Sequence, residues 1–301
     1  MKIIMVMEML SERLRKSLLD RMDTNLGVRL EKQQGKFCCL LSHDLDDVKS
    51  GEIIDDVVEL EDDMGIRSTL FVMPSQTKFR DAIMEARERG FDIALHNIKR
   101  PLVTINPPFS VSRLVEKSYI GVLRSEIVYF NRKVGRISGF APHGIGCYLQ
   151  SDINTSWDII ENTALSCDDI LWVRGYRGIL KTDNGHYFGK PVPMYWRIRG
   201  EQRKLVIPVS WDDRFLFSSW EERNFYGGKA SNSVEDAMHD IYSSLDFCGE
   251  NNIPFVINLH PIHWVNGVIE TMKLLEKLVS YCRMIKCPMY TFTELYKMVA
   301  R

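Results

Sequence analysis

The chain has 301 residues, of which 45% are hydrophobic and 26% are charged, and its formal net charge is −1. A chain of this length can bury a core without disulfide or metal staples, and it could form one large barrel or two smaller domains. A net charge so close to zero gives no electrostatic basis for binding nucleic acid, so no such partner is expected.

The seven cysteines form no C-x-x-C pair, and their number is odd. Cys38 and Cys39 are neighbours in an apolar run and are expected to be small core residues, which is typical of a reducing compartment. No apolar stretch has the length of a membrane span, and the first residues lack the cleavage site of a signal peptide. We therefore expect a cytoplasmic protein with no integral membrane segment.

Residues 1–34 have the pattern of an amphipathic helical extension, because Leu14, Leu18 and Met22 recur at helical spacing. Packing of this extension on the rest of the chain is the first expectation. Contact with a membrane surface and homo-oligomerisation are the alternatives that the pattern leaves open. Residues 35–301 show no linker or composition break and are expected to form one domain.

Short apolar runs alternate with longer helical patterns through that domain. The predicted strands are 37–41, 68–73, 91–95, 137–140, 170–173, 205–209 and 254–259, and the predicted helices are 51–64, 79–89, 111–134, 157–165, 233–247 and 267–283. Continuous apolar strands separated by helices are typical of a parallel sheet covered on both faces. We predict a distorted α/β barrel of seven or eight parallel strands, with an open doubly wound sheet as the alternative. The basic stretch 197–204 alternates like a hairpin.

Chemically capable side chains stand where the predicted strands end. In chain order they are Asp44, Asp46, Asp47, His96, His143, Arg174, Asp212, Asp213, His260 and His263. The carboxyl ends of parallel strands meet on one face of a barrel, where active sites are built. A carboxylate with two imidazoles suits Zn²⁺ or a similar divalent ion with a position open to water. A second carboxylate as base and a further histidine as acid would complete metal-assisted hydrolysis of an amide or ester.

Five segments in the same order resemble the polysaccharide deacetylase superfamily (NodB homology, carbohydrate esterase family 4), over about residues 36–300. These segments are 42–47, 65–72, 90–96, 207–213 and 258–264. The resemblance implies a distorted (β/α) barrel that uses a divalent metal to remove acetyl groups from sugars, or to hydrolyse related amides. It also implies that Asp44 is the base, Asp46 and His96 are metal ligands, and His260 is the acid.

Two positions depart from the family's pattern. A second histidine ligand would stand at position 100, which is Arg100, and the arginine that tethers the base would stand at position 141, which is Ala141. A subset of the family takes a ligand from its third motif, where this chain has His143. We therefore expect Asp46, His96 and His143 to hold the ion, with Zn²⁺ as the first expectation. Arg174 or Arg100 is expected to replace the tether.

Asp212 and Asp213 have two interpretations, as turn residues or as partners of the acid. In the second, one of these carboxylates accepts a hydrogen bond from His260 and keeps it protonated near neutral pH. Asp44 and Asp46 could likewise be caps of the next helix, His96 a loop residue and His143 part of a tight turn. His263 is a lesser candidate for the acid, or a core histidine.

The leading hypothesis is a metal-dependent hydrolase that removes an acetyl or related acyl group from an amino sugar or glycan precursor. The alternative is a catalytically silent protein that keeps the fold to bind carbohydrate, which Arg100 and Ala141 motivate. A metal-dependent sugar isomerase or lyase is a weaker third hypothesis, since such barrels usually need more acidic ligands.

Overall fold

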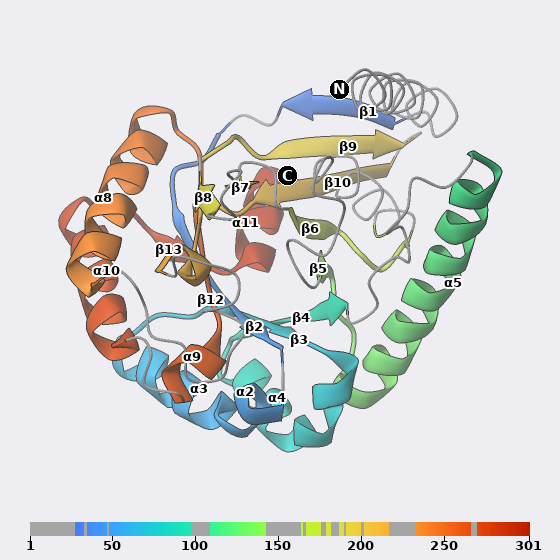
Figure 1. Cartoon of the computed structure of the whole chain (residues 1–301), viewed down its shortest axis with the longest axis horizontal. Coiled ribbons are helices and arrows are strands. Elements are labelled where there is room, and N and C mark those ends of the chain that lie inside the picture. Colours follow the sequence, from blue (N-terminus) through green and yellow to red (C-terminus); the bar gives the residue numbers. More distant parts are fainter. Residues whose placement is uncertain are drawn as a thin grey trace, which may run out of the picture.

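The computed structural model describes residues 28–32, 35–46, 48–97, 109–142, 164, 167–175, 179–181, 187–189, 191–199, 202–216, 233–265 and 270–301. These residues form a curled sheet with helices around its outer side (Figure 1). The strand order is β1-β9-β10-β6-β5-β4-β3-β2-β12-β11, and β13 pairs with β2 beside this path.

The strands are β1 (Val28–Lys32), β2 (Cys39–Leu45), β3 (Thr69–Val72), β4 (Asp92–Asn97), β5 (Gly139–Pro142), β6 (Trp172–Gly175), β7 (Ile179–Lys181), β8 (Tyr187–Gly189), β9 (Tyr195–Arg199), β10 (Gln202–Pro208), β11 (Trp211–Asp212), β12 (Phe255–Leu259) and β13 (Met289–Tyr290). The helices are α2 (Val48–Glu52), α3 (Ile54–Asp63), η1 (Pro74–Phe79), α4 (Arg80–Glu88), α5 (Phe109–Val134), η2 (Asp213–Leu216), α8 (Val234–Glu250), α9 (Pro261–Val265), α10 (Thr271–Met284) and α11 (Phe292–Val299).

The strands from β10 to β11 along the sheet order pair in parallel, as the apolar runs predict. All seven predicted strands are present, and the distorted (β/α) barrel is confirmed as a mostly parallel half-barrel. Among the described residues the strand order ends at β1 and β11, so the curl is open there. Five of the six predicted helices are also present, whereas segment 157–165 is described only at residue 164.

The sheet has an antiparallel part as well. Strands β9 and β10 form the hairpin that the alternation of residues 197–204 predicts, and β1 pairs with the outer side of β9. Strand β1 corrects the expectation that residues 1–34 are a helical extension, because residues 28–32 are extended. Their alternation of Val28 and Leu30 with Arg29 and Glu31 has the period of a strand. Residues 1–27 lie outside the described part of the chain.

Strand β2 is buried along its whole length because both of its faces are covered. Cys38 and Leu40 pack into one hydrophobic cluster, while Cys39 and Leu41 pack into another. The same alternation continues past Leu41, so adjacent polar residues of β2 face opposite sides of the sheet. His43 contacts Glu61 of α3, with Nε2 2.5 Å from Oε1, whereas Asp44 faces the inner side.

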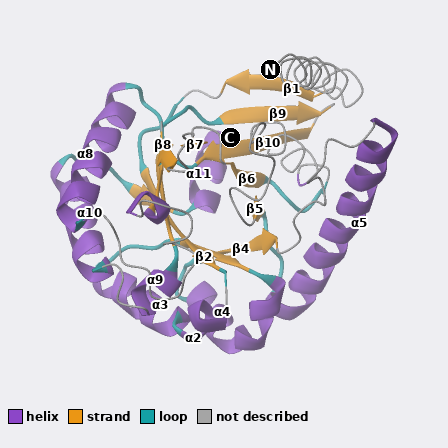
Figure 2. Cartoon of the chain, in the orientation of Figure 1, coloured by secondary structure: helices purple, strands orange, loops and turns teal. Residues whose placement is uncertain are grey.

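Helices α8, α10, α3, α4 and α5 surround the sheet in Figures 1 and 2, and α11 lies within the arc they form. Phe292 of α11 stacks on Trp172 of β6 with ring centroids 5.0 Å apart, which fixes this helix against the sheet. Helices α8 and α11 each begin with a reciprocal capping box, at Ser233 and Thr291.

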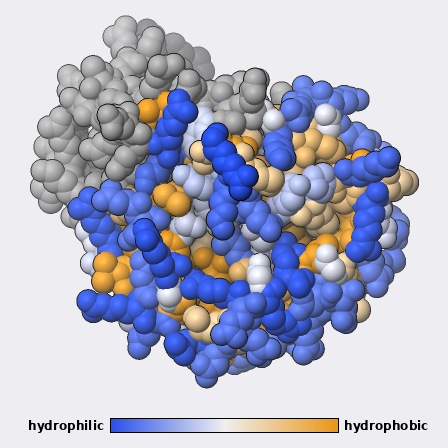
Figure 3. Space-filling model, turned by 180° about the vertical axis from the view of Figure 1, so that it is seen from behind, coloured by the Kyte–Doolittle hydropathy of each residue, from blue (hydrophilic) through white to orange (hydrophobic). Residues whose placement is uncertain are grey.

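The face seen in Figure 3 is mainly hydrophilic, with apolar residues in separate areas. Among the helices that the structure describes, none combines the length and the apolar character needed to cross a membrane.

Candidate functional site

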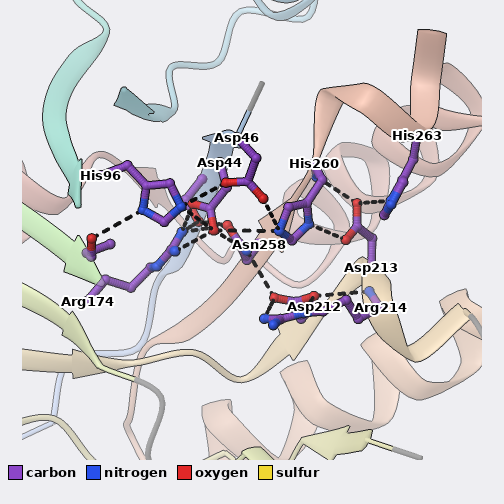
Figure 4. A network of polar contacts seen from close by, with 12 residues as sticks. Asp44, Asp46, His96, Arg174, Asp212, Asp213, Arg214, Asn258, His260 and His263 are labelled. Carbon is purple, nitrogen blue, oxygen red and sulfur yellow. Dashed lines mark hydrogen bonds and ion pairs between the residues drawn. The ribbon is translucent and has the colours of Figure 1, made fainter. Parts of the chain in front are cut away.

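Asp44 is the centre of a buried polar network on the inner side of the sheet (Figure 4). Its carboxylate faces the guanidinium of Arg174 from β6, with Nη2 2.7 Å from Oδ2 and Nη1 2.6 Å from Oδ1. Such a two-point contact fixes the plane of a carboxylate as well as its charge. The guanidinium carbon of Arg174 also lies 4.1 Å from the ring centroid of Phe71, which adds a cation–π contact.

Asp44 stays ionised although it is buried. Burial alone would raise the pKa of this carboxyl, but the charges of Arg174, His96 and His260 and the hydrogen bond from Arg174 lower the pKa well below its ordinary value. The base that the resemblance implies is therefore present as an oriented carboxylate at neutral pH.

Asn258 of β12 links Asp44 to a second buried acid. Its Nδ2 donates to Asp44 Oδ2 at 3.1 Å and to Asp212 Oδ2 at 3.0 Å. Its Oδ1 accepts from Arg174 Nη1 at 2.5 Å and lies 3.0 Å from the hydroxyl of Ser42. All the donor and acceptor positions of the carboxamide are used, which fixes its orientation.

Asp212 at the end of β11 is held by Arg214 rather than by a histidine. Arg214 donates to it from its backbone N–H at 3.0 Å and from Nε at 2.5 Å, and Nη2 makes a further ion pair. Burial opposes ionisation, but the charge of Arg214 outweighs burial and lowers the pKa of Asp212. The structure therefore separates the two neighbouring acids: Asp212 faces Asn258, and Asp213 faces the histidines.

His96 on β4 lies on the other side of Asp44, next to Asp46. Its Nδ1 is 3.2 Å from the carbonyl oxygen of Ala141 on β5, and its Nε2 is 2.9 Å from Asp46 Oδ1. A carbonyl only accepts, so Nδ1 donates the hydrogen bond to it, and Nε2 is the ring nitrogen that faces the carboxylate. Either a proton on Nε2 or a cation between Nε2 and the carboxylate oxygen satisfies this second contact.

A divalent metal ion fits this arrangement. Asp44, Asp46 and His96 each offer a ligand atom within 4.8 Å of the others. An imidazole whose second nitrogen donates to a carbonyl has the orientation typical of metal-binding histidines. The Asp46 side chain is also partly exposed, at 27%, so the position opens toward solvent. Asp46 and His96 would bind the ion directly, with Asp44 beside it.

His260 follows β12 and approaches Asp44 and Asp46 from the opposite side. Its Nε2 is 3.7 Å from Asp44 Oδ2 and 3.7 Å from Asp46 Oδ2. Its Nδ1 lies 2.6 Å from Asp213 Oδ1, and its backbone N–H donates to Asp213 Oδ2 at 2.6 Å. Burial alone would lower the pKa of His260, but the charge of Asp213 and its hydrogen bond outweigh burial and raise the pKa to about 9.

Asp213 keeps its charge for a similar reason. Burial would raise its pKa, but His260 and His263 lower the pKa well below its ordinary value. His263 of α9 contributes through Nδ1, which lies 3.1 Å from Asp213 Oδ2. The arrangement pairs an ionised carboxylate at Asp44 with a protonated imidazole at His260, which is an acid and a base facing one site.

The structure brings together most of the side chains that the sequence singles out: Asp44, Asp46, His96, Arg174, Asp213 and His260. The expected ends of three strands were wrong. Asp44, His96 and Arg174 lie inside β2, β4 and β6, whereas the sequence placed them after these strands. These strands run on because the polar side chains have partners on the inner face and so tolerate burial. His143, Arg100 and Asp47 lie outside the described residues.

Two members of the network were not assigned roles from the sequence. Asn258 stands two residues before His260, so strand alternation could have placed it on the inner face. Arg214 stands two residues after Asp212 at the start of η2, and nothing in its sequence context marks it. Conversely, His43 belongs to the acidic segment by sequence but faces Glu61 on the outer side.

Comparison with known proteins supports the fold. A protein from Mycobacterium smegmatis assigned as a polysaccharide deacetylase aligns with a TM-score of 0.60 and 15% identity, over 88% of this chain and 91% of that chain. Puue allantoinase aligns with a TM-score of 0.56 and 12% identity, over 88% of this chain and 90% of that chain. No protein-family model and no curated protein sequence matches the chain.

These likenesses confirm at the level of fold the resemblance stated from the sequence. The chain has the distorted (β/α) barrel of the polysaccharide deacetylases. At such low identity the relation shows architecture alone, so the chemistry of the site is argued from its own residues.

Proposed function

We propose that the chain is a metal-dependent hydrolase that removes an acetyl or related acyl group from an amino sugar or glycan precursor. One observation carries this proposal. The ionised Asp44, fixed by Arg174, lies beside Asp46 between His96 and the protonated His260 (Figure 4). Metal-assisted hydrolysis of an amide uses a base, a site for an electrophilic cation and an acid within reach of one reacting group.

Asp44 and His260 act on different atoms of the reaction, namely the attacking water and the leaving amine. The carboxylate of Asp44 takes the proton of the attacking water, and Arg174 and Asn258 keep the carboxylate oriented for that transfer. His260 Nε2 donates a proton to the leaving amine, and Asp213 holds the imidazole in the protonated form.

A divalent ion, with Zn²⁺ as the first candidate, would supply a Lewis acid for the substrate carbonyl. Asp46 and His96 would hold it together with His143, which lies outside the described residues.

An acetylated sugar is the first substrate class to test, because the Mycobacterium smegmatis protein with this fold is assigned as a polysaccharide deacetylase. The allantoinase of the same fold places small amides second. Protein loaded with one equivalent of zinc should release acetate from at least one member of a panel of N-acetylglucosamine, chito-oligosaccharides and acetylated nucleotide sugars, and EDTA should stop the release. Protein that carries one equivalent of zinc but hydrolyses neither these sugars nor allantoin would overturn the proposal.

Paired variants separate metal binding from proton transfer. Asp44→Asn should keep one equivalent of zinc at the Asp46 site and lose roughly 10²–10⁴ of the turnover, which is the usual worth of a general base. Asp46→Asn and His96→Gln should lose both that zinc and the activity. Asp240→Asn and His239→Gln are matched controls, since both residues are exposed on α8 and should change neither. Full turnover in Asp46→Asn would remove Asp46 from the site.

A further inference from the structure

Asp213, His260 and His263 form a second cluster of metal-binding side chains, called here the Asp213 triad. Within it, Asp213 and His263 lie on the side of His260 that faces away from the Asp46–His96 pair (Figure 4). Asp213 Oδ1 is 2.6 Å from His260 Nδ1, and Asp213 Oδ2 is 3.1 Å from His263 Nδ1. One ligand atom from each residue lies within 4.8 Å of the other two.

The donors of the triad match the chemistry of zinc. A carboxylate and two imidazoles are a common protein ligand set for Zn²⁺, with bonds of about 2.0–2.2 Å. In tetrahedral coordination, two atoms bound to one such ion lie about 3.3–3.6 Å apart. The three side chains are therefore already close to the spacing that an ion would impose, and they need small adjustments only.

The backbone holds the triad in place. The N–H of His260 donates to Asp213 Oδ2 at 2.6 Å, which ties η2 to the end of β12. The N–H of His263 donates to the carbonyl of His260 at 2.9 Å, which keeps the two histidines on one turn. All three residues are buried, so a bound ion would exchange little of its ligation with bulk water.

The charge of the surroundings favours a cation. Among the described residues drawn in Figure 4, the four carboxylates of Asp44, Asp46, Asp212 and Asp213 stand against the guanidinium groups of Arg174 and Arg214 and the imidazolium of His260, which leaves one net negative charge. Both guanidinium groups are engaged, since Arg174 binds Asp44 and Arg214 binds Asp212. The carboxylates of Asp46 and Asp213 are the ones that face histidines.

We propose that the Asp213 triad is a second zinc site, separate from the Asp46–His96 site, and that its occupation inhibits the enzyme. Zinc binding at His260 Nδ1 displaces the proton of that nitrogen to solvent, and His260 keeps its remaining proton on Nε2. His263 binds through Nδ1 with its single ring proton on Nε2. The ion also binds the carboxylate of Asp213, so the hydrogen bond between Asp213 and His260 Nδ1 is lost. A neutral imidazole bound to zinc is a much weaker acid than an imidazolium, so His260 no longer gives up a proton to a leaving amine. The binding half of this proposal stands alone, whereas the inhibitory half rests on the proposed hydrolase function.

Zinc stoichiometry tests the binding half without any substrate. Metal-free protein is titrated with Zn²⁺ by calorimetry, and bound metal is counted by elemental analysis after desalting. The intact chain should bind two equivalents, while Asp46→Asn, His263→Phe and Asp213→Asn should each bind one. The double variant Asp46→Asn/His263→Phe should bind none. His239→Phe, at an exposed histidine of α8, is the matched control and should bind two.

The outcomes distinguish the two proposals. One equivalent in the intact chain, or a second equivalent that survives in both His263→Phe and Asp213→Asn, overturns the second site. His263→Gln repeats the test with a smaller change in shape if the phenylalanine variant fails to fold. Where acetate release is found, excess zinc should lower the turnover rate of the intact chain at least tenfold below its rate at one equivalent. The same excess should leave the turnover rate of His263→Phe equal to that variant's own rate at one equivalent. Two bound equivalents, together with no hydrolysis of any substrate by protein loaded with only one equivalent, would support the second site and contradict the proposed function.

Discussion

Asp213 and His260 show how two buried residues set each other's charge. The carboxylate accepts from both Nδ1 and the backbone N–H of His260, at 2.6 Å each. Because neither contact passes through solvent, the attraction is strong enough to outweigh the burial of both groups. A hydrolase that uses His260 as its acid therefore has this acid in the protonated form over most of the physiological pH range.

This pairing predicts the alkaline limb of activity. The pKa of His260 is raised to about 9, so turnover should fall as pH rises through that value. Asp213→Asn removes the charge that raises the pKa and should move the limb toward the ordinary histidine value of about 6.5. The profile of kcat against pH, measured on protein that carries one equivalent of zinc, checks this. An unchanged alkaline limb in Asp213→Asn would show that His260 is not the acid.

The same shift predicts how stability depends on pH. The pKa of His260 is higher in the folded chain than in an unfolded one, so its protonation stabilises the fold. This contribution is complete below about pH 6.5 and is lost as pH rises through about 9. In EDTA, urea unfolding of the intact chain should show a loss of stability across this window, and Asp213→Asn should show a much smaller one. Equal slopes in the two proteins would contradict the assignment.

At the scale of elements, the close approach of β5 and β6 depends on Gly139. A Cβ at this position would lie 1.9 Å from the Trp172 ring, so the indole lies directly on the backbone of β5. Trp172 also stacks on Phe292 and contacts Phe71 edge to face, so it cannot move aside alone. The glycine thus allows three elements to share one aromatic cluster beneath the site.

Gly139→Ala should accordingly destabilise the chain by about 1–3 kcal/mol, the usual cost of overpacking a core. Gly121→Ala is the matched control, because a Cβ there meets nothing within 4 Å in the middle of α5. That change should stabilise the helix by about 0.5–1 kcal/mol. Thermal and urea unfolding measure both. A neutral Gly139→Ala would mean that the indole can shift without loss.

The elements were largely predictable from the sequence, whereas their contacts were not. Apolar runs located seven of the described parallel strands because both faces of this sheet are buried, and they missed only the two-residue strands β11 and β13. The ends of β2, β4 and β6 were missed because polar residues such as Asp44 looked like loop residues. The contact of Arg174 with Asp44, and the pairing of His260 with Asp213 in place of Asp212, depend on strand register and on side-chain direction. Hydrophobic patterning does not contain that information.

At the scale of the whole molecule, the curled sheet gathers acids from distant parts of the chain into one buried site. Asp44 and Asp212 are far apart in sequence, yet Asn258 bridges them with hydrogen bonds of 3.1 and 3.0 Å. The proposed metal ligands come from separate elements, since Asp46 follows β2 and His96 lies in β4, so an unfolded chain does not hold them together. Metal binding and folding are therefore expected to be linked.

Zinc should raise the thermal midpoint of unfolding. A ligand present at one hundred times its Kd adds about 2.7 kcal/mol when it binds only the folded state. For a chain of this size that corresponds to a rise of a few degrees. The rise should shrink in Asp46→Asn and vanish in Asp46→Asn/His263→Phe, whereas Asp240→Asn should behave like the intact chain. Scanning calorimetry with and without zinc decides the question, and an undiminished rise in the double variant would place the ion elsewhere.

The opposite orientations of His43 and Asp44 bear on how the chain selects its strand register during folding. A slip of β2 by one residue would exchange the two faces. Asp44 would then meet Glu61 of α3, placing two carboxylates together in a buried layer, and the guanidinium of Arg174 would meet an imidazole. The first slipped pair places two carboxylates together without water, and the second leaves the guanidinium of Arg174 without a carboxylate. The polar residues that form the site therefore also favour the native strand register, since only this register gives both Asp44 and Glu61 a nitrogen-bearing partner.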